Sequence, residues 1–267
     1  MSYLSPLLTM MVNAVKKATS NLDRDFSEIE RLQSSVRPYQ NFVANAYDKT
    51  AQNLRIELGK IRPDAVFFEK DVTEIPAKGS CFLVNPIEGL NNFSRGIAMF
   101  ATTVTYCENG EVKAAVIYNR GSDELYFAEK GNGAYKEGFR SHERLRVSTN
   151  KDEKFALIAV QDGHKDSAEK FAAINKVLQN DIQYRVLGSI AMSMVYTAAG
   201  KFDMTISCDN SLNSVAAGVL LVKEAGGYIY NTDAAEIRPS KTEQALTSQN
   251  IAVANNNMES LLKKFAG

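Results

Sequence analysis

The sequence has no excess charge of either sign, because 31 Lys and Arg residues balance 31 Asp and Glu residues. A chain without an overall electrostatic field has no general attraction for nucleic acid or for an acidic membrane surface. Direct nucleic-acid binding is therefore not predicted. The sequence also lacks any run of about 18 apolar residues, so no membrane-spanning helix is predicted.

Cysteine and histidine are scarce, and neither residue type offers a reactive site. Cys81, Cys107 and Cys208 are odd in number, far apart and without metal-ligand spacing. This pattern indicates free thiols in a cytoplasmic protein rather than a disulfide framework. Cys208 has no base at motif spacing, which argues against a nucleophilic role. His142 and His164 are isolated in polar segments, so no histidine-based mechanism is predicted.

What the sequence does contain is an ordinary globular composition, with 45% apolar and 23% charged residues in a chain of 267. Such a chain can bury a large core, as one domain or as two intimate subdomains. The opening segment, 4–17, has apolar residues at helical spacing, and its basic residues follow the apolar ones. This arrangement predicts an amphipathic helix and not a signal peptide. A second helix is predicted over residues 41–61, with Ala46, Ala51, Leu54 and Leu58 on one stripe.

Short strand-like segments follow in quick succession between residues 65 and 136, joined by turns such as ENGE and NRGSDE. They predict an antiparallel meander that ends near residue 148. After residue 154, predicted strands and helices alternate, which predicts layered α/β structure with a ligand crevice at the strand ends. The strands are expected over 155–160, 183–187, 202–207 and 228–231, and the helices over 166–179, 189–200, 214–227 and 257–266. We therefore expect two subdomains, 1–150 with the N-terminal helices and antiparallel sheet and 151–267 with the α/β layers, sharing one cleft as a single functional unit.

The segment CFLVNPIEGLNNFSRG, residues 81–96, marks the candidate site. An apolar strand stops at Asn85-Pro86, and Gly89 follows in a tight polar turn. Strand ends of this kind hold an ion or a phosphate in many enzymes. Only Glu88 is acidic in this stretch, whereas a site for a hard cation normally has several carboxylates.

Four motifs, in order, carry a resemblance over essentially the whole chain. They are NPIEGLNNFSRGI, GNGAYKEGFRSHERLRVS, RVLGSIAMSMVYTAAGKFD and NSVAAGVLLVKEAGG. They match D-P-[IL]-D-G-T-x-N-F-x-x-G, G-x-G-A-[FY] with L-x-V-S, R-x-x-G-S-A-A with A-x-G-x-x-D, and W-D-x-A-A-G with E-A-G-G. On these motifs the sequence resembles the inositol monophosphatase family, in particular its bacterial extragenic-suppressor (SuhB-like) branch.

The resemblance implies a mixed α/β fold, a layered αβαβα sandwich, which usually forms a homodimer. It implies Mg²⁺-dependent hydrolysis of a sugar-alcohol phosphate such as inositol monophosphate. In that chemistry, Mg²⁺ held by carboxylates polarises the phosphate and lowers the pKa of a bound water. The bacterial branch is associated with RNA polymerase and Nus-type antitermination factors, which implies protein partners in the transcription machinery.

The resemblance also assigns the site positions, and most of them lack the expected side chain. The metal positions are Lys70, Asn85, Ile87, Glu88 and Ser214, of which Ile87 offers only its backbone carbonyl. At four further positions the residue also differs from the one that the family has. Leu90 replaces the Thr that orients the nucleophilic water, and Ser207 replaces the Glu that contacts inositol hydroxyls. Asn213 replaces a Trp, and Tyr47 replaces an acidic residue that supports a further ion.

The charge at the four principal metal positions decides our main hypothesis. The family has four carboxylates there, whereas the charges of Lys70 and Glu88 cancel and Asn85 and Ser214 are neutral. At an effective dielectric constant of about 20, each lost charge–charge attraction is worth several kcal/mol. We therefore expect a degenerate metal site with no Mg²⁺ and no other cofactor. We also expect a Lys70–Glu88 ion pair, with Asn85 and Ser214 hydrogen-bonded around it.

Alternatives stay open at this point. A one-residue slip could bring Glu69 or Asp71 into the place of Lys70, and Asp209 lies near the expected cleft. The chain would then be an active Mg²⁺-dependent inositol-1-phosphate phosphatase with a rearranged metal site. Glu88 could also be an ordinary solvated acid of a turn.

Anion binding without hydrolysis is a further expectation. A helix that starts near Leu90 offers backbone N–H groups at Gly89, Leu90 and Asn91, with Lys70 close by, and predicts binding of a phosphate or sulfate. Asp203 matches a family position near a strand, where a structural role is predicted. Two hypotheses result: a binding or regulatory protein with a role in transcription antitermination, or an active phosphatase.

Overall fold

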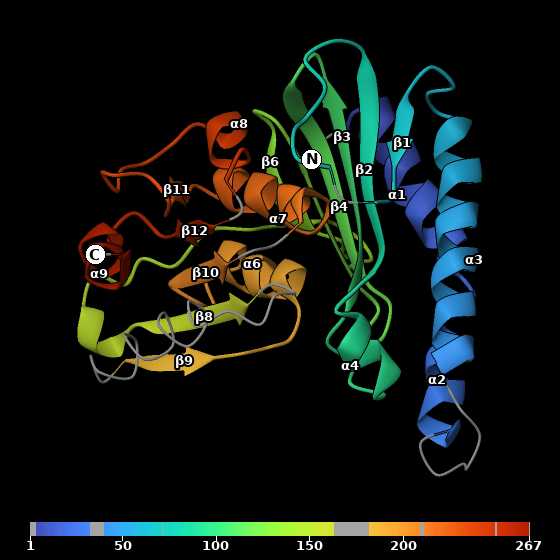
Figure 1. Ribbon diagram of the computed structural model, residues 1–267, viewed down its shortest axis with the longest axis horizontal. Coiled ribbons are helices and arrows are strands. Elements are labelled where there is room, and N and C mark those ends of the chain that lie inside the picture. The colour runs from blue at the N-terminus through green and yellow to red at the C-terminus, as the bar shows by residue number, and fades with distance from the viewer. Residues whose placement is uncertain are drawn as a thin grey trace.

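The structure, a computed structural model, describes residues 4–32, 40–70, 72–162, 182–208, 211–248 and 250–266. Its elements form five layers, in which two sheets alternate with three layers of helices (Figure 1). The αβαβα sandwich expected from the sequence is confirmed.

The first sheet has seven strands in sequence order. They are β1 (Val66–Phe68), β2 (Ser80–Glu88), β3 (Ala101–Glu108), β4 (Glu111–Asn119), β5 (Glu124–Glu129), β6 (Gly133–Lys136) and β7 (Glu143–Arg144). β2 to β7 are antiparallel neighbours, as the meander predicted. The two-residue loop between β3 and β4 has positive φ at Asn109 and Gly110, 52° and 80°, which suits the twist of a tight hairpin.

The prediction for β1 was wrong in direction, because β1 pairs with β2 in parallel. Parallel neighbours cannot be joined by a hairpin and need a longer crossover. The connection between Phe68 and Ser80 fulfils that need. This connection begins with Glu69 and Lys70, which therefore lie just beyond the end of β1.

Three helices cover the outer face of the first sheet: α1 (Pro6–Ala18), α2 (Leu22–Leu32) and α3 (Gln40–Gly59). The stripes predicted for α1 and α3 are confirmed, since Met11 and Val15 of α1 and Leu54 and Leu58 of α3 are fully buried against the sheet. Ser5 caps α1, with its hydroxyl oxygen 3.1 Å from the N–H nitrogen of Leu8.

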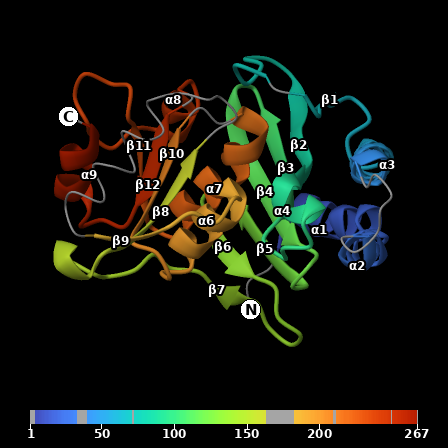
Figure 2. The same ribbon diagram turned by 60° about the horizontal axis from the view of Figure 1, so that its bottom comes forward.

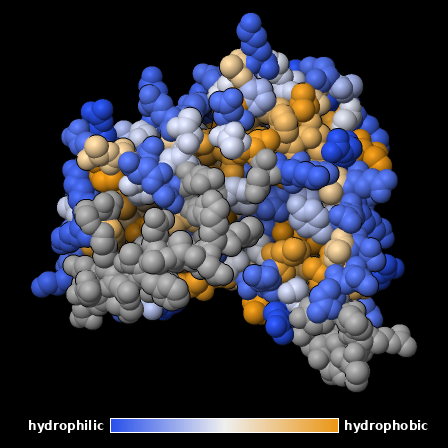
Figure 3. Space-filling model, in the orientation of Figure 1, coloured by the Kyte–Doolittle hydropathy of each residue, from blue (hydrophilic) through white to orange (hydrophobic). Residues whose placement is uncertain are grey.

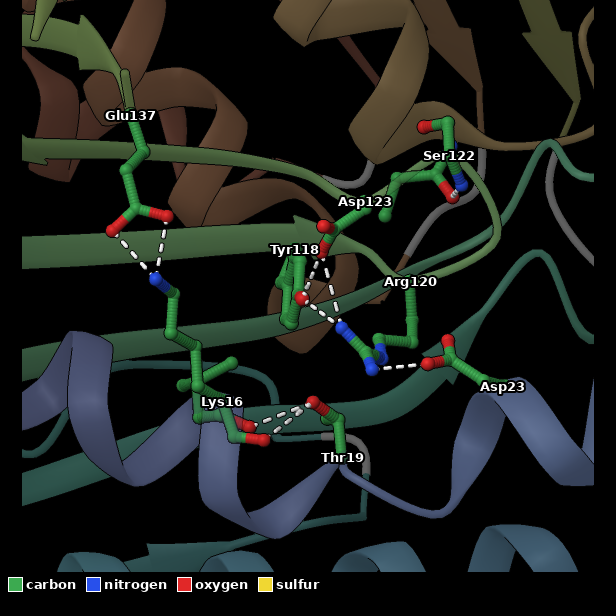
Figure 4. Close-up of polar contacts among 10 residues, drawn as sticks. Lys16, Thr19, Asp23, Tyr118, Arg120, Ser122, Asp123 and Glu137 are labelled. Carbon is green, nitrogen blue, oxygen red and sulfur yellow. Dashed lines mark hydrogen bonds and ion pairs between the residues drawn. The ribbon is translucent and has the colours of Figure 1, made fainter. Parts of the chain in front are cut away.

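Polar contacts anchor α1 and α2 to the same sheet (Figure 4). Arg120, in the turn after β4, donates to Asp23 of α2 and to the hydroxyl of Tyr118. Lys16 of α1 lies 2.7 Å from a carboxylate oxygen of Glu137. The Arg120 side chain is only 22% exposed, so its pair with Asp23 is better shielded from solvent than a typical surface ion pair.

The central layer consists of α6 (Ile190–Ala198) and α7 (Leu212–Glu224), between the two sheets (Figure 2). Both helices are apolar nearly all round, as expected for helices that are covered on every side. A Cβ atom at Gly218 of α7 would lie 2.7 Å from the Cβ atom of Met194 of α6. The glycine therefore permits the close approach of these two helices.

The second sheet has the strand order β11-β12-β10-β8-β9. Its strands are β8 (Leu157–Asp162), β9 (Gln183–Arg185), β10 (Met204–Cys208), β11 (Tyr228–Asn231) and β12 (Ile251–Ala254), with the short helices η1 (Glu153–Phe155) and α8 (Thr242–Ala245) nearby. α9 (Glu259–Ala266) packs its apolar side against the outer face of this sheet. The helix expected over residues 166–179 lies outside the described residues.

The prediction missed β12, a run of only four residues, IAVA. All four are buried, so the segment lacks the alternation of apolar and polar residues that marks a half-exposed strand. Its place between β10 and β11 is decided by pairing with both neighbours.

The expected boundary at residues 150 and 151 falls between β7, the last strand of the first sheet, and β8, the first strand of the second. Cys81, Cys107 and Cys208 are free thiols, as expected. None of the helices within the described ranges is long and apolar enough to cross a membrane.

Two of the sequence motifs contact each other directly. Glu224, from EAGG at the end of α7, accepts hydrogen bonds from the backbone N–H groups of Gly131 and Gly133 in GNGA, both at 2.9 Å. A carboxylate that receives two N–H groups fixes the turn between β5 and β6 against the central layer. These motifs therefore stabilise the fold.

Candidate functional site

The candidate site lies where β2 ends and α4 (Leu90–Ser94) begins. Gly89 joins the two elements with φ +79°, a conformation that favours glycine. A Cβ atom at this position would lie 3.0 Å from the carbonyl oxygen of Met99 and 3.2 Å from Cβ of Ser189. The turn therefore needs glycine both for its backbone conformation and for its close packing against the residue that precedes α6.

Asn85 of β2 and Ser214 of α7 form one hydrogen-bonded group across the site. The Asn85 Nδ2 atom donates to the Ser214 hydroxyl at 3.0 Å, and the Ser214 and Ser211 hydroxyl oxygens lie 2.9 Å apart. The expected hydrogen bonding of Asn85 with Ser214 is present. The Asn85 Oδ1 atom is buried and has no partner among the described residues.

Asn213, at the position of the family tryptophan, ties α7 to the first sheet. Its Nδ2 atom donates to the carbonyl oxygen of Phe68 at 2.8 Å and to that of Val84 at 3.0 Å. The backbone carbonyl oxygen of Asn213 accepts from the hydroxyl of Thr103 at 2.9 Å. The residue is 2% exposed, and these hydrogen bonds join the end of β1 and the middle of β2 to α7.

Glu88, the last residue of β2, directs its carboxylate to the first turn of α6. Oε1 accepts from the Ile190 N–H at 3.0 Å, and Oε2 accepts from the Ala191 N–H at 3.2 Å and from the Ser189 hydroxyl. Burial raises the pKa of the Glu88 carboxyl to about 7, and these hydrogen bonds act in the opposite direction. The residue is 7% exposed, so the alternative that it is a solvated acid of a turn is wrong.

The expected ion pair between Lys70 and Glu88 does not form. Lys70 is exposed, while Glu88 is buried and engaged by α6. The neighbouring Glu69 contacts Arg55 of α3, with 3.4 Å between the charged atoms. The sequence could not show this, because the direction of the Glu88 side chain depends on the position of α6. Asp71 and Asp209 lie outside the described residues.

The remaining predicted positions have different degrees of exposure. Ile87 is buried with the apolar cluster below α4, and Ser207 of β10 is fully buried. Leu90 is 39% exposed at the start of α4, and Asn91 is exposed beside it. Tyr47 of α3 packs partly buried against the same cluster as Ile87. In Figure 3, apolar residues show on the surface in the region of α4, in agreement with the exposure of Leu90 and Ile97.

The arrangement brings together one carboxylate, two amides and several hydroxyls. Throughout the part of the chain that the structure describes, no three His, Cys, Asp or Glu residues form a group that could hold a metal ion. Sequence reasoning had no role for Ser189, Ser211 or the Asn213 amide. Ser189 and Ser211 do precede helices, the position at which serine is favoured, and that signal was available.

Comparisons with known proteins agree with the sequence motifs. A family model described as "Inositol monophosphatase family" matches residues 3–266. An inositol-1-monophosphatase from Rhizobium meliloti (strain 1021) is 36% identical over 235 residues, which cover 86% of this chain and 86% of that protein. The Nus factor SuhB of Escherichia coli (strain K12) is 28% identical over 232 residues, 84% of each chain. The crystal structure of extragenic suppressor protein suhB from Bartonella henselae has a TM-score of 0.81 at 27% identity and covers 98% of this chain and 99% of that chain.

Proposed function

Because this chain belongs to the inositol monophosphatase family, we propose that it has kept the family fold and lost Mg²⁺-dependent phosphomonoester hydrolysis. In this proposal the protein acts by binding, as a regulatory protein, and needs no metal cofactor. The single observation that carries the proposal is the donor set at the end of β2.

That donor set does not fit Mg²⁺, which requires hard oxygen ligands in nearly octahedral geometry. Lys70 brings an ammonium group, and Asn85, whose Nδ2 atom donates to Ser214, offers only a neutral amide oxygen, Oδ1, in place of a carboxylate. Both oxygens of Glu88 are already occupied by donors of α6. A divalent cation would find no free carboxylate among these residues and would meet the positive charge of Lys70.

The proposed partners are proteins of the transcription machinery. One relative at 28% identity carries the name Nus factor SuhB, which supports this choice. A binding role of this kind does not require a metal, so it is compatible with the side chains at the site. The proposal includes a homodimer and an inorganic phosphate or sulfate bound near Lys70 and α4.

An active phosphatase is the second candidate, and the comparisons favour it. The relative at 36% identity is named an inositol-1-monophosphatase and is more similar to this chain than the Nus factor is. Hydrolysis would require carboxylates from other positions. Glu69 contacts Arg55, so it would have to give up that ion pair to serve as a ligand.

Titration of Mg²⁺, and of Mn²⁺ as a second divalent cation, into the purified protein tests the choice. We expect no saturable binding by calorimetry and no phosphate release from inositol 1-phosphate above the protein-free blank. The R. meliloti relative, prepared in the same way, serves as the positive control for hydrolysis. Saturable binding together with turnover would refute the proposal and establish the second candidate.

Affinity purification of the tagged protein from its own cells, followed by mass spectrometry, tests the partner. We expect RNA polymerase subunits or antitermination factors to be enriched over a tag-only control. Enrichment of neither group would count against the role in transcription, whatever the result of the metal titration. Light scattering of the same protein measures its oligomeric state, and inorganic phosphate titrated by calorimetry measures anion binding.

A further inference from the structure

The contact between Glu88 and α6 joins two layers that are distant in sequence. Glu88 ends β2 in the first sheet, and α6 begins in the central layer, 102 residues later at Ile190. Ser189, Ile190 and Ala191 are each no more than 1% exposed, so their donors have no access to bulk water. A buried donor without an acceptor is destabilising, and Glu88 satisfies three of them at once.

The same contact compensates the charge of the carboxylate. The N-terminus of a helix carries partial positive charge, and hydrogen bonds from N–H and O–H groups to a carboxylate are stronger than neutral ones. Ser189 completes the helix start, because its hydroxyl oxygen also accepts from the Met192 N–H at 3.2 Å. Protein donors thus occupy both oxygens of the Glu88 carboxylate.

We infer that Glu88 is a positioning residue: its carboxylate fixes the start of α6 to the end of β2 and is thereby unavailable as a metal ligand. An internal acid–helix contact then holds the site together, in a place where the family resemblance assigns a metal ligand. This inference rests on the proposed loss of metal-dependent hydrolysis, and it adds the reason why the one remaining carboxylate does not rescue the site.

Side-chain length supports the assignment. The resemblance places aspartate at this position, and glutamate is longer by one carbon–carbon bond, about 1.5 Å. The shorter side chain, placed on the same backbone, would lose reach toward the N–H groups of Ile190 and Ala191, which lie 3.0 and 3.2 Å from the Glu88 oxygens. E88D therefore separates the two roles, because it keeps the charge and shortens the reach.

The first experiment measures the positioning role in the wild-type background. Amide hydrogen exchange at Ile190 and Ala191 is compared between wild type, E88D and the matched control E111D, whose carboxylate lies on the surface at the start of β4 and is 47% exposed. We expect at least tenfold faster exchange at both amides in E88D and no change in E111D. Unchanged protection in E88D would overturn the positioning role.

The second experiment measures metal affinity in two restored sites that differ only at position 88. The variant K70E/N85D/S214D keeps Glu88, and K70E/N85D/S214D/E88D does not. Calorimetry with Mn²⁺ is expected to show at least tenfold tighter binding by the variant with E88D. Equal affinity of the two variants, including no binding by either, would overturn the inference. A different result would refute the proposed function: binding of Mg²⁺ by the wild-type protein together with release of phosphate.

Discussion

Asp203→Ala is expected to lower the free energy of unfolding by about 3–5 kcal/mol, because it removes the acceptor of a buried polar network. The carboxylate of Asp203, 6% exposed, accepts from Asn150 Nδ2 at 3.2 Å, from Leu157 N–H at 2.9 Å and from Asn255 Nδ2 at 3.3 Å. It also accepts from the hydroxyl of Ser148. Alanine would leave these donors without an acceptor, and each donor would lose a charge-assisted hydrogen bond.

Thermal unfolding followed by circular dichroism checks this expectation, with a decrease in Tm of about 10 °C. D203N keeps one acceptor oxygen and should lose only part of the stability. The matched control is D64A, whose carboxylate is 65% exposed and paired with Arg62, and a change below about 1 kcal/mol is expected there. Comparable losses in D203A and D64A would show that the network around Asp203 does not stabilise the second sheet.

The prediction tests the structural role that the sequence assigned to Asp203. The donors to its carboxylate come from the segment before β8, from β8 itself and from the residue after β12. The network thus joins strands of the second sheet near the start of β10. No part of it contacts Asn85 or Ser214, so D203A should act on stability.

Phe100→Ala is expected to destabilise the protein by about 3–5 kcal/mol, the range found when a buried aromatic ring is deleted from a core. Phe100 is 1% exposed, and its ring centroid lies 5.1 Å from that of Phe26 in α2 and 5.0 Å from that of Phe93 in α4. Deletion of the ring removes the packing that supports α4 from below. Since α4 carries Leu90 and Asn91, amide exchange along α4 should also become faster.

Denaturant unfolding of F100A measures the loss, and F100L, which refills part of the volume, should recover part of it. Phe139 provides the matched control, because its side chain is fully exposed at 101%. We expect F139A to change the free energy of unfolding by less than about 0.5 kcal/mol. A loss in F100A no larger than that in F139A would contradict the assigned support of α4.

The turn at the end of β2, residues 85–89, keeps the backbone of the family while its side chains bond to other parts of the protein. Pro86 and Gly89 keep the chain path at the end of β2, while Asn85 and Glu88 bond to protein groups on α7 and at the start of α6. In the proposed function this turn has changed from a place for ions into a junction between layers. The fold can tolerate that change, because the layers are held mainly by buried apolar surface.

Elements with strong periodicity or clear turn chemistry could be predicted from the amino-acid sequence. The apolar stripes of α1 and α3, the hairpin residues Asn109 and Gly110, and the four motifs are local features. The resemblance also placed Lys70, Asn85 and Ser214 where the family has carboxylates, and this assignment stays a prediction. None of these conclusions required knowledge of which elements lie next to each other.

The hydrogen-bond partners within the site, in contrast, depend on contacts between residues that are distant in sequence. Asn85 and Ser214 are 129 residues apart, and Glu88 and Ile190 are 102 residues apart. The ion pair of Glu88 with Lys70 was the simplest expectation from charge, yet the packing of α6 against the end of β2 gives the carboxylate three buried donors instead. Hydrogen bonds act over about 3 Å, so the direction of a side chain in this site follows from the placement of α6 and α7 between the two sheets, which no local pattern specifies.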